Sequence, residues 1–218
     1  LTLRRFDDVV ERLSELDDAG SFGAVRLRRM LVETALSSEP PRDELAAAVL
    51  NEMATDSGLP IEDRAWTVAR QTERRLRDGF TDEAIARLLR VMPRVENAPD
   101  ATRGELFLLL GEAYAETGAI RDAEKQLERA TTLLTEGDGL YARALLVQGR
   151  VLEQSGRPAE ARERFERIAG SYASSGSFLP GLVALGEVLS VLSELDPTMA
   201  SEADAVAASS RFVDEARL

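Results

Sequence analysis

The chain has 218 residues, with 27 basic and 39 acidic side chains that give a formal net charge of −12, and it contains no cysteine and no histidine. The negative charge opposes binding to nucleic-acid phosphates and to anionic lipid. The two missing residue types exclude thiol nucleophiles, Ser-His and Cys-His catalysis and ordinary zinc sites, so we expect neither a metal nor another cofactor.

Apolar residues recur three and four positions apart along the whole chain, without the alternation typical of strands, so the sequence predicts helices throughout. The first helix, about 3–18, is expected to cap the stack. Five antiparallel pairs are expected after it: 24–37 with 42–56, 62–78 with 81–96, 103–117 with 120–135, 140–155 with 158–173, and 178–194 with 200–216. Prolines are expected to fall between helices, where they break no hydrogen-bond ladder, at Pro40, Pro41, Pro60, Pro93, Pro99 and Pro197.

A helix-start pattern recurs along the chain at intervals of 38 to 42 residues. An acidic or small segment opens a helix each time, and the recurring positions are Leu45, Ala84, Ala123, Ala161 and Ala203. A fixed period in this range is typical of tandem helical repeats.

The centre of the chain carries large and small residues at fixed positions in two successive helix pairs. The first pair has Phe107, Leu110, Gly111, Tyr114, Gly118, Ala123, Leu127 and Ala130, and the second has Leu145, Gly149, Leu152, Gly156, Ala161 and Phe165. This pattern resembles the tetratricopeptide repeat family, although Gln148 replaces the expected leucine in the second pair. The family period is about 34 residues, so the longer period here indicates longer helices or loops.

The resemblance implies an all-α fold: a right-handed α-α superhelix of about five helical hairpins with an N-terminal capping helix. We expect residues 1–218 to form one solenoid domain, with a degenerate N-terminal part at 1–60, the best-matching repeats at 61–173 and a divergent hairpin at 174–218. Close packing explains the pattern, because Gly111, Ala123 and Gly149 would let paired helices approach while larger residues fill the adjoining gaps.

The chain begins at Leu1 and is charged from Arg4 onward, so we expect no signal peptide and a soluble segment of a longer protein. No apolar run approaches the roughly 18 residues of a membrane span. A chain without cysteine suits the cytoplasm as well as the oxidising periplasm, so the compartment stays open.

In the tetratricopeptide family the first helix of each pair lines the concave surface, which implies a row of partner-binding residues in this chain. From the second, third and fourth pairs these are Trp66, Arg70, Glu73 and Arg77; Glu105, Leu108, Glu112 and Glu116; and Arg143, Val147, Arg150 and Glu153. Each set recurs at helical spacing and can form one face. The positions do not reproduce the Lys/Asn/Arg constellation with which some family members bind C-terminal carboxylates.

Each of these residues also has a purely structural interpretation. The charged side chains could form solvated faces with pairing one turn apart. Trp66 could be a binding hot spot or a core residue, since it shares a stripe with Ala69 and Leu76. The apolar run 106–110 could contact a ligand, mediate self-association or be buried between repeats.

The sequence predicts a non-catalytic scaffold that binds a protein or peptide partner in its concave groove. One alternative is a homo-oligomer assembled through end faces, because the last predicted helix has the apolar stripe Ala203, Val206, Ala207, Phe212 and Val213. A small-molecule binder or enzyme is a second alternative, and it rests only on abundant carboxylates such as Glu160 and Glu163.

Overall fold

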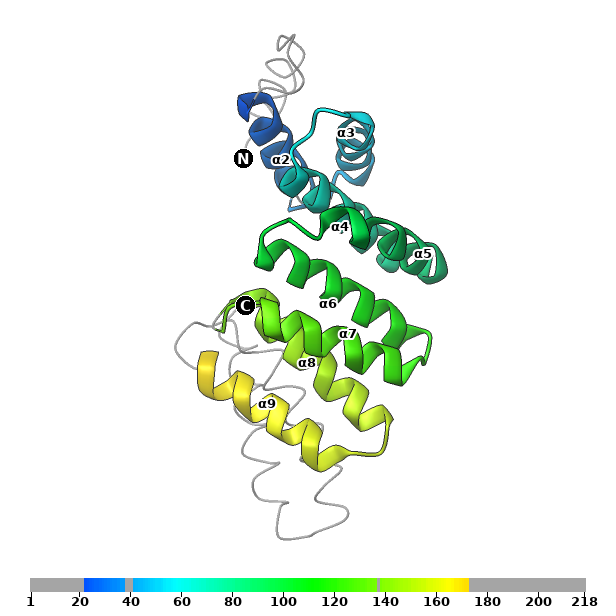
Figure 1. The fold of residues 1–218 in the computed structure, drawn as a ribbon, viewed down its shortest axis with the longest axis vertical. Helices are drawn as coiled ribbons and strands as arrows, with labels where there is room; N and C mark the ends of the chain where they lie inside the picture. The colour runs from blue at the N-terminus through cyan, green and yellow to red at the C-terminus, as the bar shows by residue number, and fades with distance from the viewer. Residues whose placement is uncertain (1–21, 38–40, 137, 173–218) are drawn as a thin grey trace.

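The structure is a computed structural model and describes residues 22–37, 41–136 and 138–172. In these ranges the chain forms four helical hairpins: α2 (Phe22–Leu36) with α3 (Asp43–Thr55), α4 (Ile61–Arg77) with α5 (Thr81–Val91), α6 (Asp100–Glu116) with α7 (Ile120–Leu133), and α8 (Gly139–Gln154) with α9 (Pro158–Tyr172). The hairpins stack one upon the next along the long axis of the molecule (Figure 1). The predicted all-α solenoid and its four central pairs are therefore confirmed.

Three predicted features lie outside the described residues: the capping helix at 3–18, the pair 178–194 with 200–216, and the apolar stripe that supports self-assembly. Pro40 and Pro197 lie outside them too.

The α-helix predicted at 81–96 is wrong only in its last five residues, 92–96. The α-helix α5 ends at Val91, and a 3₁₀ helix, η1 (Met92–Val95), follows it directly. Pro93 lies at the start of η1 rather than between helices, because proline lacks the N–H that an α-helix interior requires but is tolerated in a first turn. By contrast, Pro60 and Pro99 directly precede α4 and α6 as predicted.

The turns that join the two helices of the last three described hairpins have the same backbone conformation. Gly79, Gly118 and Gly156 have φ values of 80°, 73° and 75°, in the left-handed region that favours glycine. The N–H of the following residue donates to the carbonyl five positions back, as from Ala119 to Tyr114 at 2.9 Å. This Schellman motif ends the first helix and turns the chain into the second.

Small residues allow the paired helices to touch. Ala84, Ala123 and Ala161 are fully buried. A Cβ built on Gly149 would lie 2.2 Å from Cε1 of Phe165, and one on Gly111 would lie 2.6 Å from Cγ of Leu127. The packing role that the sequence predicts for these glycines is confirmed.

Candidate functional site

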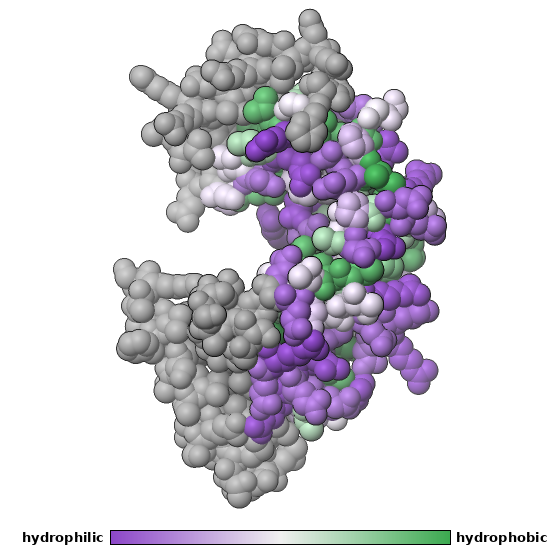
Figure 2. Space-filling model, turned by 60° about the vertical axis from the view of Figure 1, so that its left-hand side comes forward, coloured by the Kyte–Doolittle hydropathy of each residue, from purple (hydrophilic) through white to green (hydrophobic). Residues whose placement is uncertain are grey.

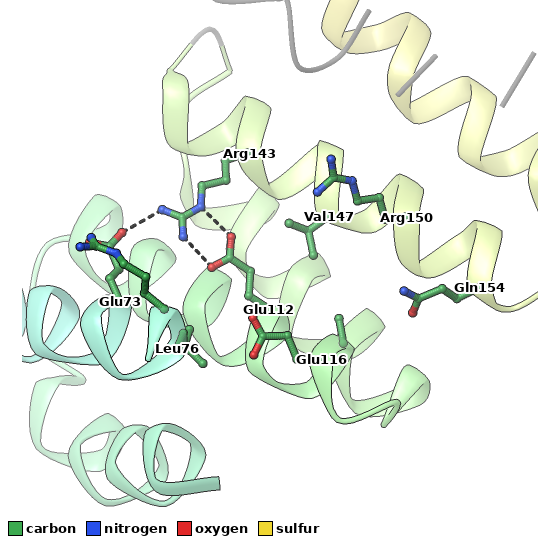
Figure 3. A pocket seen from close by; sticks show the side chains of 10 residues that line it. Glu73, Leu76, Glu112, Glu116, Arg143, Val147, Arg150 and Gln154 are labelled. Atoms are coloured by element: carbon green, nitrogen blue, oxygen red, sulfur yellow. Dashed lines mark hydrogen bonds and ion pairs between the residues drawn. The ribbon is translucent and has the colours of Figure 1, made fainter. Parts of the chain in front are cut away.

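The first helices of three successive hairpins, α4, α6 and α8, line a groove of about 560 Å³. Figure 3 shows side chains from all three helices projecting toward this hollow. The lining residues are Glu73, Leu76, Arg77, Glu112, Ala115, Glu116, Arg143, Val147, Arg150 and Gln154.

Most of the residues expected on the concave face do line this groove. These are Glu73, Arg77, Glu112, Glu116, Arg143, Val147 and Arg150. Whether they bind a partner stays a prediction. The sequence interpretation missed Leu76, Ala115 and Gln154; Gln154 lies four positions after Arg150, so helical spacing could have identified it.

The expectation that Leu108 lies on the concave face is wrong, because Leu108 is fully buried and offers no surface to a partner. It packs in the core that α6 shares with α7 and α8. Leu106, Leu109 and Leu110 are equally buried, so burial is the correct interpretation of the apolar run. The physical reason is that α6 contacts α4, α5, α7 and α8, which cover more than one stripe of the helix.

Trp66 is also core. Its exposed fraction is 7 %, and it packs with residues of α2 and α3. The guanidinium groups of Arg29 and Arg70 lie 4.8 and 5.8 Å from its ring centroid, which places cations over the ring. Glu153 is half-buried on α8 and does not line the groove.

An ion-pair chain crosses the floor of the groove. Nε and Nη2 of Arg143 donate to the two carboxylate oxygens of Glu112, each at 2.6 Å, and Nη1 donates to Oε1 of Glu73 at 2.8 Å (Figure 3). Arg70 continues the chain with an ion pair to Oε2 of Glu73 at 3.0 Å and another to Glu105. Two planar forks therefore join α4, α6 and α8, an arrangement to which arginine is suited.

Burial and pairing set the charge states along this chain. Burial raises the pKa of Glu112 above its ordinary value, although Arg143 acts in the opposite direction. Burial lowers the pKa of Arg70. Burial acts to lower the pKa of Arg143 too, but the hydrogen bonds and negative charges of Glu112 and Glu73 prevail and raise it.

The other charged lining residues differ in whether they have partners. Arg77 pairs with Asp43 at 3.2 Å, and Glu116 accepts a hydrogen bond from the Thr81 hydroxyl at 2.8 Å. Arg150 is exposed and makes no hydrogen bond or ion pair with any described residue. Within the described part of the chain, Arg150 therefore presents an unpaired guanidinium to the groove.

Outside the groove, the described residues line other hollows, such as one of about 400 Å³ between α2 and α4. Figure 2 shows a mostly hydrophilic surface in which green hydrophobic residues are interspersed. Over residues 22–37, 41–136 and 138–172, no cluster of three or more acidic residues has the geometry to hold a metal ion. None of the helices in the same ranges is long and apolar enough to cross a membrane.

No protein-family model and no curated protein matches the sequence. Solved structures do match the fold. BtubC (BKLC) from P. vanneervenii is similar with a TM-score of 0.64 and 13 % identity, over 94 % of this chain and 88 % of that one. Nearly identical TPR-like repeats of a proposed kinesin light chain from Podosopora anserina give 0.57 and 18 %, over 96 % and 95 %.

MamA is similar as well, with a TM-score of 0.57 and 17 % identity over 82 % of this chain and 92 % of that one. At such identities the similarity shows the fold alone. The chain has a tetratricopeptide-like helical repeat fold.

Proposed function

We propose that the chain is a non-catalytic protein-interaction scaffold that binds a peptide or a helix of a partner protein in the groove of α4, α6 and α8. The observation that supports this proposal most is the groove itself, since side chains from three successive hairpins converge on one hollow of about 560 Å³. Stacked helical repeats bind partners through extended concave surfaces of this kind.

The ion-pair chain supports a binding role because it holds the groove wall in place before a partner arrives. Glu112 and Glu73 are only 15 % and 20 % exposed, and both are fixed by Arg143. Side chains that are already ordered lose little conformational entropy on binding.

Among the described residues, Glu112 best fits the role of a catalytic acid, since a carboxylate with a raised pKa in a cleft is typical of that role. However, both of its oxygens accept hydrogen bonds from Arg143. A general acid needs an oxygen that can reach the substrate. The geometry of Glu112 therefore favours a structural role.

The proposal can be tested by affinity capture from a lysate of the source organism with two variants of the chain. The groove variant combines Val147→Gln, which removes an apolar contact, with Arg150→Glu, which reverses the charge of a groove-lining side chain. We leave Arg143 unchanged, because its replacement would disrupt the ion-pair chain. We expect the parent chain to retain a partner that the groove variant loses.

The matched control is Arg121→Glu, at an exposed position of α7 that does not line the groove. Circular dichroism should show equal helicity and thermal midpoints for all three proteins. Equal capture of the partner by the groove variant and the control would contradict binding in the groove.

A further inference from the structure

Arg150 is the only groove-lining guanidinium without an acidic partner among the residues that the structure describes. Arg143 is engaged by Glu112 and Glu73, and Arg77 by Asp43. An arginine fork presents parallel N–H donors that match a carboxylate. Gln154, one turn later on the same face of α8, has an amide that forms no hydrogen bond with a described residue and can add a donor.

Apolar side chains line the same groove as this guanidinium. Val147 precedes Arg150 by one turn of α8, and Figure 3 shows both projecting from that helix toward the groove. Leu76 and Ala115 supply apolar surface from α4 and α6. All three are only partly buried, so an apolar side chain of a partner can cover what remains exposed.

The overall charge of −12 does not cancel the attraction of Arg150 for a single carboxylate. At physiological ionic strength, charges more than about 8 Å apart on the surface are largely screened, so nearby groups dominate. Glu116 disfavours acidic runs, because it brings a carboxylate to the same groove and its one hydrogen-bond partner among the described residues is the neutral Thr81 hydroxyl.

Building on the proposed function, we infer that the groove recognises a partner segment in which one acidic side chain lies near one apolar side chain. The acid pairs with Arg150, and the apolar group covers Val147, Leu76 and Ala115. The ligand group is a side-chain carboxylate of an internal segment, and the partner is neither polyacidic nor basic at this position.

The test measures fluorescence anisotropy with fluorescein-labelled peptides of about 12 residues, long enough to contain the i to i+7 anchors of a groove-bound helix. Each peptide has an amidated C-terminus and a Ser/Ala background. It contains one leucine and, one to four positions away, a glutamate, a glutamine or a lysine. A further peptide carries a run of glutamates beside the leucine.

We expect the best glutamate peptide to bind the parent chain about fivefold more tightly than its lysine counterpart, the scale of a favourable exposed ion pair. Arg150→Glu should reverse this order, and Arg121→Glu should preserve it. The polyglutamate peptide should bind no better than the peptide with one glutamate.

Two results would overturn the inference: equal affinity for the glutamate, glutamine and lysine peptides, or no binding of any glutamate peptide. Val147→Gln separates this failure from failure of the proposed function. If Val147→Gln weakens peptide binding but the charge of the peptide does not alter its affinity, the groove still binds and only the preference for an acid is wrong. If peptides bind and neither Val147→Gln nor Arg150→Glu alters their affinity, the groove is not the site and both proposals fail.

Discussion

Gly149 shows how a single missing Cβ positions two helices. The ring of Phe165 is fully buried and occupies the place of a side chain at residue 149. We expect Gly149→Ala to lower the free energy of unfolding by about 1–2 kcal/mol, because the overpacking cost exceeds the gain in helix propensity. Urea denaturation would measure the loss.

Gly139→Ala is the matched control for Gly149→Ala, since a Cβ at residue 139 would meet no atom within 4 Å. The stability of this control should stay equal or rise slightly. Adding Phe165→Leu to Gly149→Ala should recover part of the loss, because the smaller side chain relieves the overlap. Equal losses at residues 139 and 149 would show that the overlap is not the cause.

Glu112 makes stability depend on pH in a defined direction. The pKa of Glu112 in the folded state lies above the ordinary value of 4.5, which applies to the unfolded state. At a pH between 4.5 and the folded pKa, Glu112 is therefore mostly protonated in the folded state and mostly ionised in the unfolded state. The stability that the Glu112 proton contributes is complete below pH 4.5 and is lost as pH rises through the folded pKa.

Glu112→Gln removes this titration while it keeps the shape of the protonated side chain. The stability of Glu112→Gln relative to the parent should therefore rise with pH across this window, as measured by urea denaturation at a series of pH values. A relative stability that falls instead would show that the bond to Arg143 outweighs burial.

At the scale of the element, the hairpin turns depend on left-handed glycines. Gly118 has a φ of 73°, a conformation in which a Cβ costs about 1–2 kcal/mol. We expect Gly118→Ala to lose about that stability in thermal denaturation, and Gly118→Asn to lose less, because asparagine tolerates this conformation better. The same loss for both variants would contradict a cause in the backbone conformation.

At the scale of the whole molecule, the ion-pair chain reaches past the adjacent hairpin, because Arg143 of the fourth described hairpin pairs with Glu73 of the second. Arg143 connects α8 to both α4 and α6. Its side chain is 38 % exposed, so solvent screens part of the interaction. We expect Arg143→Gln to cost about 1–3 kcal/mol, between the values for exposed and buried pairs.

The cost of Arg143→Gln should shrink when the salt concentration rises from about 0.05 to 1 M, because ions screen the partly exposed pair. Urea denaturation of the parent and of Arg143→Gln at both salt concentrations measures this cost. Arg121→Gln, at an exposed position of α7, is the control and should change stability little in either condition. A cost that is independent of salt would assign the effect of Arg143 to packing.

Within the described residues, the sequence alone determined the helices, the hairpin pairing and the small-to-large contacts, because each leaves a local signal. Helical periodicity can be recognised from a few neighbouring residues. A glycine at a turn, such as Gly118, indicates a positive φ at its own position. Among the described helices, the boundary that differs most from its prediction is the end of α5 at Val91, where Pro93 permits a 3₁₀ turn as well as a loop.

Only the tertiary structure decided which predicted face is buried and which carboxylates meet which arginines. Leu108 and Val147 have the same apolar character, but neighbouring helices bury Leu108 fully and leave Val147 partly exposed in the groove. Arg143 forms ion pairs with Glu112 and Glu73, which lie 31 and 70 positions away in the sequence. Periodicity identifies a face of a helix, but the packing of several helices determines what covers it.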